Sequence, residues 1–161
     1  MEEFIRVPYG STVHGEEEID AVINVLKTTT QMSKNVREFE SKVAAKYSKD
    51  YGIMVNSGSS ALYLSIESLN LPMGSEVITP ALTFGTTVAS IVNNKLVPVF
   101  VDVKPDTYCI DETQIESKIT KNTSAIVAPD LMGNICEWPY IRELADKHNL
   151  KILVDSADTI G

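Results

Sequence analysis

The spacing of apolar residues predicts two amphipathic helices in the first third of the chain. Apolar positions recur every three or four residues between 19 and 26 and again between 36 and 47, which is the period of a helix with one buried face. We therefore expect helices over 16–27 and 36–47. The acidic side chains of Glu16, Glu17 and Glu18 suit the first helix, because negative charge stabilises the amino end of a helix.

From residue 52 onward, short apolar runs alternate with helical patterns. The runs that we expect to be strands are 52–55, 76–79, 97–103, 124–128 and 151–155. The helical patterns between them cover 59–68, 83–93, 113–119 and 138–148. Several of the runs are almost wholly apolar, as in strands that helices cover on both faces. The sequence therefore predicts an α/β fold with three layers, in which helices cover both faces of a mostly parallel sheet.

Length and composition are those of an ordinary globular domain. The 161 residues are 43% hydrophobic and 7% aromatic, and a chain of this length is expected to form one core. A net charge of -8 with no basic block argues against nucleic acids or anionic membranes as main partners. The first residues indicate neither a signal peptide nor a membrane span, so we expect a cytoplasmic protein. Cys109 and Cys136 have no Cys-x-x-Cys spacing and no nearby histidine, so no metal site is expected.

The segment 55–62, Val-Asn-Ser-Gly-Ser-Ser-Ala-Leu, places small residues where a strand would pass into a helix. Gly58 would let another group approach the backbone closely, and the N–H groups of Ser59 and Ser60 would be free to face an anion. A serine that caps a helix produces the same pattern. The motif alone is therefore compatible with a phosphate site and with an ordinary helix cap.

Two further residues follow predicted strand ends. Asp155 ends a run that is otherwise apolar, and a carboxylate there needs a partner or a solvated cleft, unless it caps the next segment. Phe84 follows the strand that ends near residue 80. Phenylalanine usually lies in the core, but beside an anion site and an acid it could stack on a bound ring. Because parallel strands end at one edge of a sheet, we expect these motifs to converge there.

Together, these motifs resemble the DegT/DnrJ/EryC1/StrS sugar aminotransferases, which are pyridoxal phosphate enzymes of the aspartate aminotransferase superfamily. The segments that carry the resemblance are 36–40, 56–62, 76–80, 98–103 and Asp155, in the family's order and with similar spacing. The resemblance implies the large domain of a fold-type I pyridoxal phosphate enzyme. It also implies a nucleotide-linked keto sugar as substrate, an amino donor such as glutamate, and a homodimer with active sites shared across the interface.

The resemblance implies roles for individual residues of this sequence. Gly58, Ser59 and Ser60 would hold the phosphate of pyridoxal 5'-phosphate, and Phe84 would stack on its ring. Asp155 would pair with the ring nitrogen and keep it protonated, which lets the ring accept electrons from a substrate carbanion. Asp158 would lie near the ring hydroxyl, where many aminotransferases of the group carry glutamine or histidine.

Some features are more similar to a branch of the family that removes the 3-hydroxyl of nucleotide-linked 4-keto-6-deoxy sugars. These features are the segments 131–134 and 96–111 and the spacing of Asp155 and Asp158. In that branch a histidine replaces the lysine that binds the cofactor. The sequence therefore leaves an aminotransferase and a 3-dehydratase open. Asp130 stands where relatives usually show histidine, and its role is also open.

Every lysine of the chain precedes Asp155, and none is placed to bind the cofactor covalently. In the family this lysine, or its histidine substitute, follows the aspartate, which here means beyond Gly161. We therefore expect residues 1–161 to be the amino-terminal part of the pyridoxal phosphate-binding large domain, without the rest of that domain and the small carboxy-terminal domain, and to be inactive alone. A third hypothesis is that the chain is a complete, non-enzymatic binding module.

Overall fold

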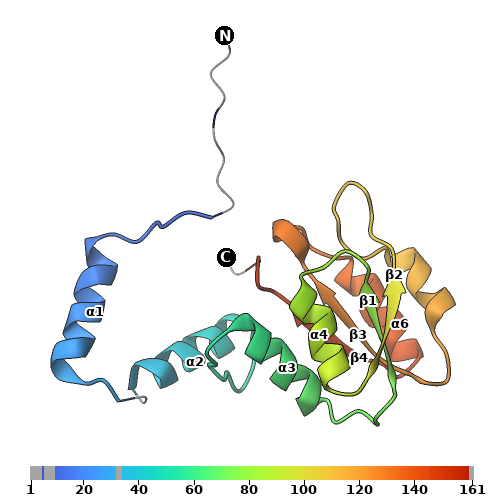
Figure 1. Ribbon diagram of the computed structural model, residues 1–161, viewed down its shortest axis with the longest axis horizontal. Helices are drawn as coiled ribbons and strands as arrows, with labels where there is room; N and C mark the ends of the chain where they lie inside the picture. Colours follow the sequence, from blue (N-terminus) through green and yellow to red (C-terminus); the bar gives the residue numbers. More distant parts are fainter. Residues whose placement is uncertain (1–4, 6–9, 32–33, 160–161) are drawn as a thin grey trace. The chain divides into compact units, whose positions relative to one another are not determined.

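The computed structural model describes residues 5, 10–31 and 34–159 of the chain (Figure 1). The chain forms two compact units, of which the first ends at Met54 and the second begins at Val55. Within the described ranges, no helix has both the length and the apolar character that crossing a membrane requires.

The first unit contains two helices, α1 (Glu16–Thr28) and α2 (Lys34–Lys46), which confirms both predicted helices. At the start of α1, the Glu18 carboxylate accepts the N–H of Gly15 at 2.7 Å. This bond lowers the pKa of Glu18, so the acidic first turn stabilises the helix as the sequence predicts. All residues of α1 are at least partly exposed, and the side chain of Leu26 is 67% exposed.

The predicted strand over 52–55 is wrong. In the described part of the structure this segment pairs with no strand, and Ile53 is 83% exposed. Its contacts go to α2, because the N–H of Met54 donates to the Glu40 carboxylate at 2.8 Å. A Cβ atom at Gly52 would lie 2.5 Å from the Glu40 carbonyl oxygen, so the two segments approach closely. An apolar run forms a strand only when neighbouring strands complete its backbone hydrogen bonds.

The second unit is built on a four-stranded sheet. Its strands are β1 (Glu76–Pro80), β2 (Val97–Val101), β3 (Thr123–Pro129) and β4 (Lys151–Asp155). They lie in the order β2-β1-β3-β4, and every neighbouring pair is parallel. The other four predicted strands and the parallel sheet are therefore confirmed. β2 ends earlier than expected, because Val103 forms an isolated antiparallel bridge with Ile110 instead of pairing with β1.

Helices alternate with these strands as predicted. α3 (Gly58–Ser68) precedes β1, α4 (Gly85–Asn93) connects β1 to β2, and α6 (Trp138–Lys147) connects β3 to β4. Between β2 and β3, the helix α5 (Glu112–Ile115) is short and continues into the 3-10 turn η1 (Glu116–Lys118). A second 3-10 turn, η2 (Leu131–Gly133), follows β3.

Two apolar clusters show that helices cover both faces of the sheet (Figure 1). Isoleucines of α3 and α4 pack with Val77 and Val127 on one face. On the opposite face, Ile141 of α6 packs with Ile78 and Ile126. Val77 and Ile78 enter different clusters because successive residues of a strand point to opposite faces. The predicted three-layer arrangement is therefore confirmed.

The order of the strands creates a switch point at the carboxyl ends of β1 and β3. From β1 the chain moves outward to β2, then crosses back past β1 to β3 and continues to β4. The connections after β1 and β3 therefore run in opposite directions, which is where open parallel sheets bind their ligands. α4 begins at this edge. The first residues of α3 also lie there, because its carboxyl end leads into the amino end of β1 (Figure 1).

Candidate functional site

Asp155 ends β4 at the carboxyl edge of the sheet, and both oxygens of its half-buried carboxylate accept hydrogen bonds. Oδ2 accepts the hydroxyl of Thr87 at 3.2 Å. Oδ1 accepts the backbone N–H of Ala157 at 3.2 Å. Both donors are neutral, so within the described part of the chain the negative charge is uncancelled, and the carboxylate retains lone pairs for another donor. A carboxylate held in this way is suited to bind a positively charged group.

Thr87 reaches Asp155 from α4. Its side chain is fully buried, and its hydroxyl oxygen accepts the hydroxyl of Thr83 at 3.0 Å. The two threonines therefore link the loop after β1 to the end of β4. Sequence reasoning missed both residues. The signal that could have found them is a pair of threonines one helical turn apart, placed where a strand passes into a helix.

Phe84 lies immediately before α4, at the same end of the helix as Thr83 and Gly85. Its side chain is 66% exposed, so the usual core position of a phenylalanine is not the one adopted here. An exposed aromatic ring offers a surface on which a planar ligand can stack. Its neighbour Thr83 belongs to the threonine pair that holds Asp155, so the ring is tied to the same end of the sheet.

The start of α3 has features of both sequence interpretations, a helix cap and an anion site. Ser57 caps the helix, because its Oγ accepts the N–H of Ser60 at 3.1 Å. The expectation that the Ser60 N–H is free is therefore wrong. The N–H groups of Gly58 and Ser59 have no partner among the described hydrogen bonds. A Cβ atom at Gly58 would meet nothing within 4 Å, so these two N–H groups are open to an anion.

Asp158 holds the turn that follows β3. Its Oδ2 accepts the N–H of Met132 at 3.0 Å. Met132 has a φ of 57°, in the left-handed region that non-glycine residues rarely adopt, and Gly133 follows with a φ of 84°. The Asp158 carboxylate therefore stabilises a strained turn next to the end of β4, and its other oxygen has no described partner.

Asp130 is a buried anchor for the loop between β3 and α6. Its Oδ1 accepts the N–H of Cys136 at 2.9 Å and the indole N–H of Trp138 at 2.8 Å. Its own N–H donates to the carbonyl oxygen of Asp155 at 3.0 Å, which continues the β3–β4 pairing beyond the strands. The side chain is 5% exposed. The sequence left the role of Asp130 open, and these contacts show that it holds the loop between β3 and α6.

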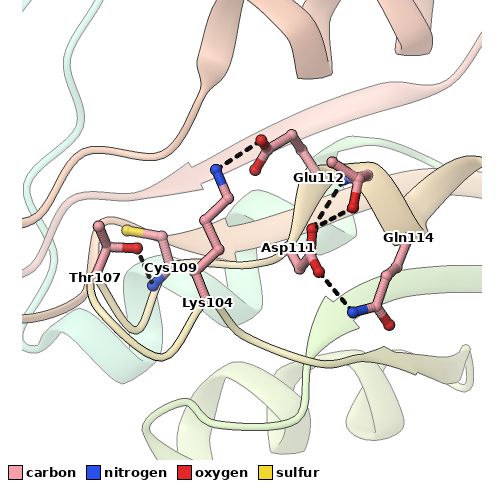
Figure 2. Close-up of polar contacts among 7 residues, drawn as sticks. Lys104, Thr107, Cys109, Asp111, Glu112 and Gln114 are labelled. Atoms are coloured by element: carbon pink, nitrogen blue, oxygen red, sulfur yellow. Dashed lines mark hydrogen bonds and ion pairs between the residues drawn. The ribbon is translucent and has the colours of Figure 1, made fainter.

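The loop after β2 is held by charge instead. The Lys104 ammonium donates to Oε1 of Glu112 at 2.6 Å, one of the contacts drawn in Figure 2. This bond raises the pKa of Lys104. Asp111 caps α5 by accepting the N–H and the hydroxyl of Thr113, and it also accepts the Gln114 amide at 2.6 Å (Figure 2). The threonine hydroxyl is the main cause of the lowered pKa of Asp111.

The groups at the carboxyl ends of β1 and β4 fit a ligand with a phosphate and a cationic ring. The start of α3 offers free N–H groups, Phe84 offers an exposed ring, and Asp155 offers an uncancelled negative charge. A hollow of about 360 Å³ lined by Arg142 and Lys151 lies at the opposite, amino end of β4, so it is not part of this arrangement. Among the described residues, no three His, Cys, Asp or Glu side chains gather as metal ligands.

Comparison with known proteins identifies the family. The model of the DegT/DnrJ/EryC1/StrS aminotransferase family matches residues 12–161. The chain belongs to this family. Its fold is that of fold-type I pyridoxal phosphate enzymes, since the E. coli GDP-4-keto-6-deoxy-D-mannose-3-dehydratase with bound hydrated PLP superposes with a TM-score of 0.91. That structure is 28% identical in sequence, and the match covers 99% of this chain and 43% of the other.

Members of this family with different named reactions are about equally similar to the chain. A dTDP-4-dehydro-2,6-dideoxy-D-glucose 3-dehydratase of Saccharopolyspora spinosa is 35% identical, over 96% of this chain and 35% of the relative. A 3-oxo-glucose-6-phosphate:glutamate aminotransferase of Bacillus subtilis is 31% identical, over 90% of this chain and 34% of the relative. The chain thus spans roughly a third to two fifths of the length of the proteins that it matches.

Proposed function

We propose that the enzyme that contains this chain is a pyridoxal phosphate-dependent aminotransferase. It places an amino group on the keto carbon of a nucleotide-linked sugar. The observation that carries the proposal is the Asp155 carboxylate, held by neutral donors at the carboxyl edge of the sheet and bonded to Thr87 near the start of α4. The family and the keto-sugar names of its relatives support the substrate class.

In this proposal the phosphate of pyridoxal 5'-phosphate binds at the start of α3. The N–H groups of Gly58 and Ser59 face the phosphate, and the positive end of the helix favours its charge. Ser60 contributes its hydroxyl and not its N–H, because Ser57 accepts that N–H. Binding of the phosphate would thus use two backbone N–H groups and the hydroxyl of Ser60.

Phe84 and Asp155 would hold the ring of the cofactor. The exposed side chain of Phe84 would stack on the ring, and the Asp155 carboxylate would hold the proton on the ring nitrogen. Asp158 uses the oxygen that does not bind Met132 to reach the ring hydroxyl. The bound cofactor supplies an electron sink for the substrate carbanion, and the uncancelled charge of Asp155 is the contribution of this chain to that chemistry.

The lysines with described ion pairs are engaged elsewhere. Lys104 pairs with Glu112, Lys147 with Glu116, and Lys42 with Glu38. We assign no lysine of this chain to the covalent bond with the cofactor. The proposal also includes a cytoplasmic homodimer, glutamate as amino donor, and residues 1–161 as the amino-terminal part of the large domain.

The second candidate is a 3-dehydratase of a nucleotide-linked 4-keto-6-deoxy sugar. It is favoured by the TM-score of 0.91 with a dehydratase of that type and by the 35% identity with another 3-dehydratase. The two reactions differ in the product of the enzyme that contains this chain. Mass spectrometry of the sugar after incubation with glutamate would show a gained amino group for the first candidate and a lost hydroxyl group for the second.

Binding of pyridoxal phosphate to the 161-residue chain tests the proposal directly. The absorbance and fluorescence of the cofactor should change on binding, and Asp155→Asn should weaken binding roughly 10- to 100-fold, because a hydrogen bond to a charged group is lost. The matched control is Asp102→Asn. Asp102 follows β2 as Asp155 ends β4, but among the described residues its carboxylate accepts only the adjacent N–H of Val103. Equal effects of both variants, or no binding by the unaltered chain, would contradict the proposal.

A further inference from the structure

We propose that Thr87, oriented by Thr83, is a positioning residue that sets the carboxylate of Asp155 for its cationic partner. The inference rests on the cofactor role proposed for Asp155. Thr87 is fully buried and donates to Oδ2 of Asp155 at 3.2 Å, while Thr83 donates to Thr87 at 3.0 Å. Because Thr87 has no exposed surface, it acts on the ligand only through Asp155.

The direction of both hydrogen bonds follows from the chemistry of the groups. An ionised carboxylate can only accept, so the single hydroxyl proton of Thr87 must point to Asp155. The oxygen of Thr87 can then only accept from Thr83. Both protons therefore point toward the carboxylate, and hydrogen bonds aligned in this way strengthen one another.

A purely local role for Thr87 would have a different geometry. A threonine in a helix commonly donates to a carbonyl oxygen three or four positions earlier, which for Thr87 would be that of Phe84 or Thr83. Here the hydroxyl bonds instead to another element, 68 positions later in the sequence. Together with the N–H of Ala157 on Oδ1, this bond engages both oxygens, which restricts rotation of the carboxylate and favours one orientation of its remaining lone pairs.

The same hydroxyl pair connects the two sides of the proposed ring site. Thr83 is the immediate neighbour of Phe84, whose ring is exposed at the start of α4. The chain Thr83–Thr87–Asp155 therefore sets the stacking residue and the acid relative to each other. A neutral donor does this without cancelling the charge, whereas Lys104 cancels the charge of Glu112.

The test measures binding of pyridoxal phosphate carrying ¹⁵N in its ring. Thr87→Val keeps the shape of the side chain and removes the donor. It should weaken binding roughly fivefold to tenfold, the value of one hydrogen bond, and move the ¹⁵N signal toward that of the unprotonated ring. Thr87→Ser restores the hydroxyl and should return both readouts close to those of the unaltered chain.

The matched control is Thr79→Val. Thr79 is also a fully buried threonine, and its hydroxyl has no partner among the described residues. This variant should bind the cofactor as the unaltered chain does. If Thr87→Val does not fold, as judged by circular dichroism, Thr83→Val decides, with an expected loss of about twofold in affinity because Asp155 keeps its direct donor.

The outcomes separate the inference from the proposed function. Suppose that the unaltered chain binds the cofactor. If the ring nitrogen signal of Thr87→Val then equals that of the unaltered chain, the inference alone is overturned. The same holds for Thr83→Val where that variant decides. Equal losses in Thr87→Val and Thr87→Ser also overturn it, since they would reflect packing and not the hydroxyl. Absence of binding by the unaltered chain overturns the proposed function, and the inference with it.

Discussion

Beyond β2 the carboxylate of Glu112 is paired with a lysine, whereas beyond β3 and β4 the carboxylates of Asp130 and Asp155 are held by neutral donors. The Glu112 side chain is 11% exposed, and Lys104 lies 2.6 Å from it (Figure 2). Asp130 accepts two N–H groups, and Asp155 accepts one N–H and one hydroxyl. The two regions lie at the same edge of one sheet and stabilise their acids by different means.

The difference indicates what each region can do. An ion pair leaves no net charge, so the Lys104–Glu112 pair can hold the loop after β2 but has little attraction left for a charged ligand. Neutral donors orient an acid and leave its charge for a partner. Asp130 uses neutral donors to hold a loop in the interior, and Asp155 uses them at the carboxyl edge of the sheet, where we propose that the cofactor binds.

The largest effect should come from removing the acceptor at Asp130. Asp130→Leu leaves the N–H of Cys136 and the indole N–H of Trp138 without a partner, and we expect a loss of about 3 kcal/mol in the free energy of unfolding. Trp138 is the single tryptophan of the chain, so its fluorescence reports the change directly. Denaturant unfolding measures the loss. Asp130→Asn keeps an oxygen acceptor and should cost at most about 1 kcal/mol; equal costs for the two variants would contradict the role of these bonds.

Removing the ion pair between Lys104 and Glu112, after β2, should have the next largest effect on stability. Lys104→Met leaves the Glu112 carboxylate without its cation, and we expect a loss of about 2 kcal/mol at pH 7. The pKa of Lys104 is raised above its ordinary value of 10.5, so this stability is present below pH 10.5 and is lost as the pH rises through the raised pKa. The difference from the unaltered chain should therefore shrink in strong alkali.

The control for this ion pair is Arg142→Met on α6. The Arg142–Asp146 pair is more than half exposed on both sides, and its removal should leave the unfolding midpoint unchanged within error. Thermal unfolding of both variants from pH 7 to pH 11.5 makes the comparison. A Lys104 variant as stable as the Arg142 variant would show that the pair after β2 does not hold the loop.

A smaller effect, of opposite sign, is expected at Thr79. Its buried hydroxyl has no partner in the described part of the chain, so Thr79→Val removes an unsatisfied polar group at almost constant volume. We expect a gain of about 1 kcal/mol in the free energy of unfolding. Thr87→Val is the matched comparison and should be destabilising, because its hydroxyl is bonded. Chemical denaturation measures the change in the free energy of unfolding for both variants. Changes of the same sign would contradict the comparison.

The smallest effect concerns the cap of α5. The pKa of Asp111 lies below its ordinary value of 3.8, mainly through the Thr113 hydroxyl. The stability from the charge is therefore present above pH 3.8 and is lost as the pH falls through the lowered pKa. Asp111→Asn should cost at most about 0.5 kcal/mol at pH 7, because asparagine is an equally good cap. In unfolding measured from pH 7 downward, the difference should shrink as the pH falls through the lowered pKa of Asp111.

Much of the fold could be predicted from local patterns. The runs near 76–79 and 151–155 became strands with almost the expected bounds, because helices cover them on both faces. The segment 52–55 has a similar apolar composition but is not a strand, since its backbone contacts go to Glu40. Whether a short apolar run forms a strand depends on neighbours that its own residues do not specify.

The candidate site could be predicted only in part. Asp155 and the start of α3 stand out in the sequence because polar or small residues follow apolar runs. Thr87 and Thr83 stand out less, since threonines are common where a loop passes into a helix. Asp130 and Asp158 look alike in the sequence, but their partners differ. The buried Asp130 accepts the indole N–H of Trp138, and Asp158 accepts the backbone N–H of Met132. Their hydrogen-bond partners come from segments that the local pattern does not connect.

The sequence by itself determined the helical and strand periods, the family, and the identity of the acid at the end of β4, because these depend on nearby residues and their order. Only the tertiary structure decided which donors hold that acid. The Thr87–Asp155 bond joins positions 68 residues apart, and such contacts exist only when the crossover of the chain brings two strand ends to one edge. Long-range packing therefore converts a recognisable aspartate into a charged group with a defined orientation.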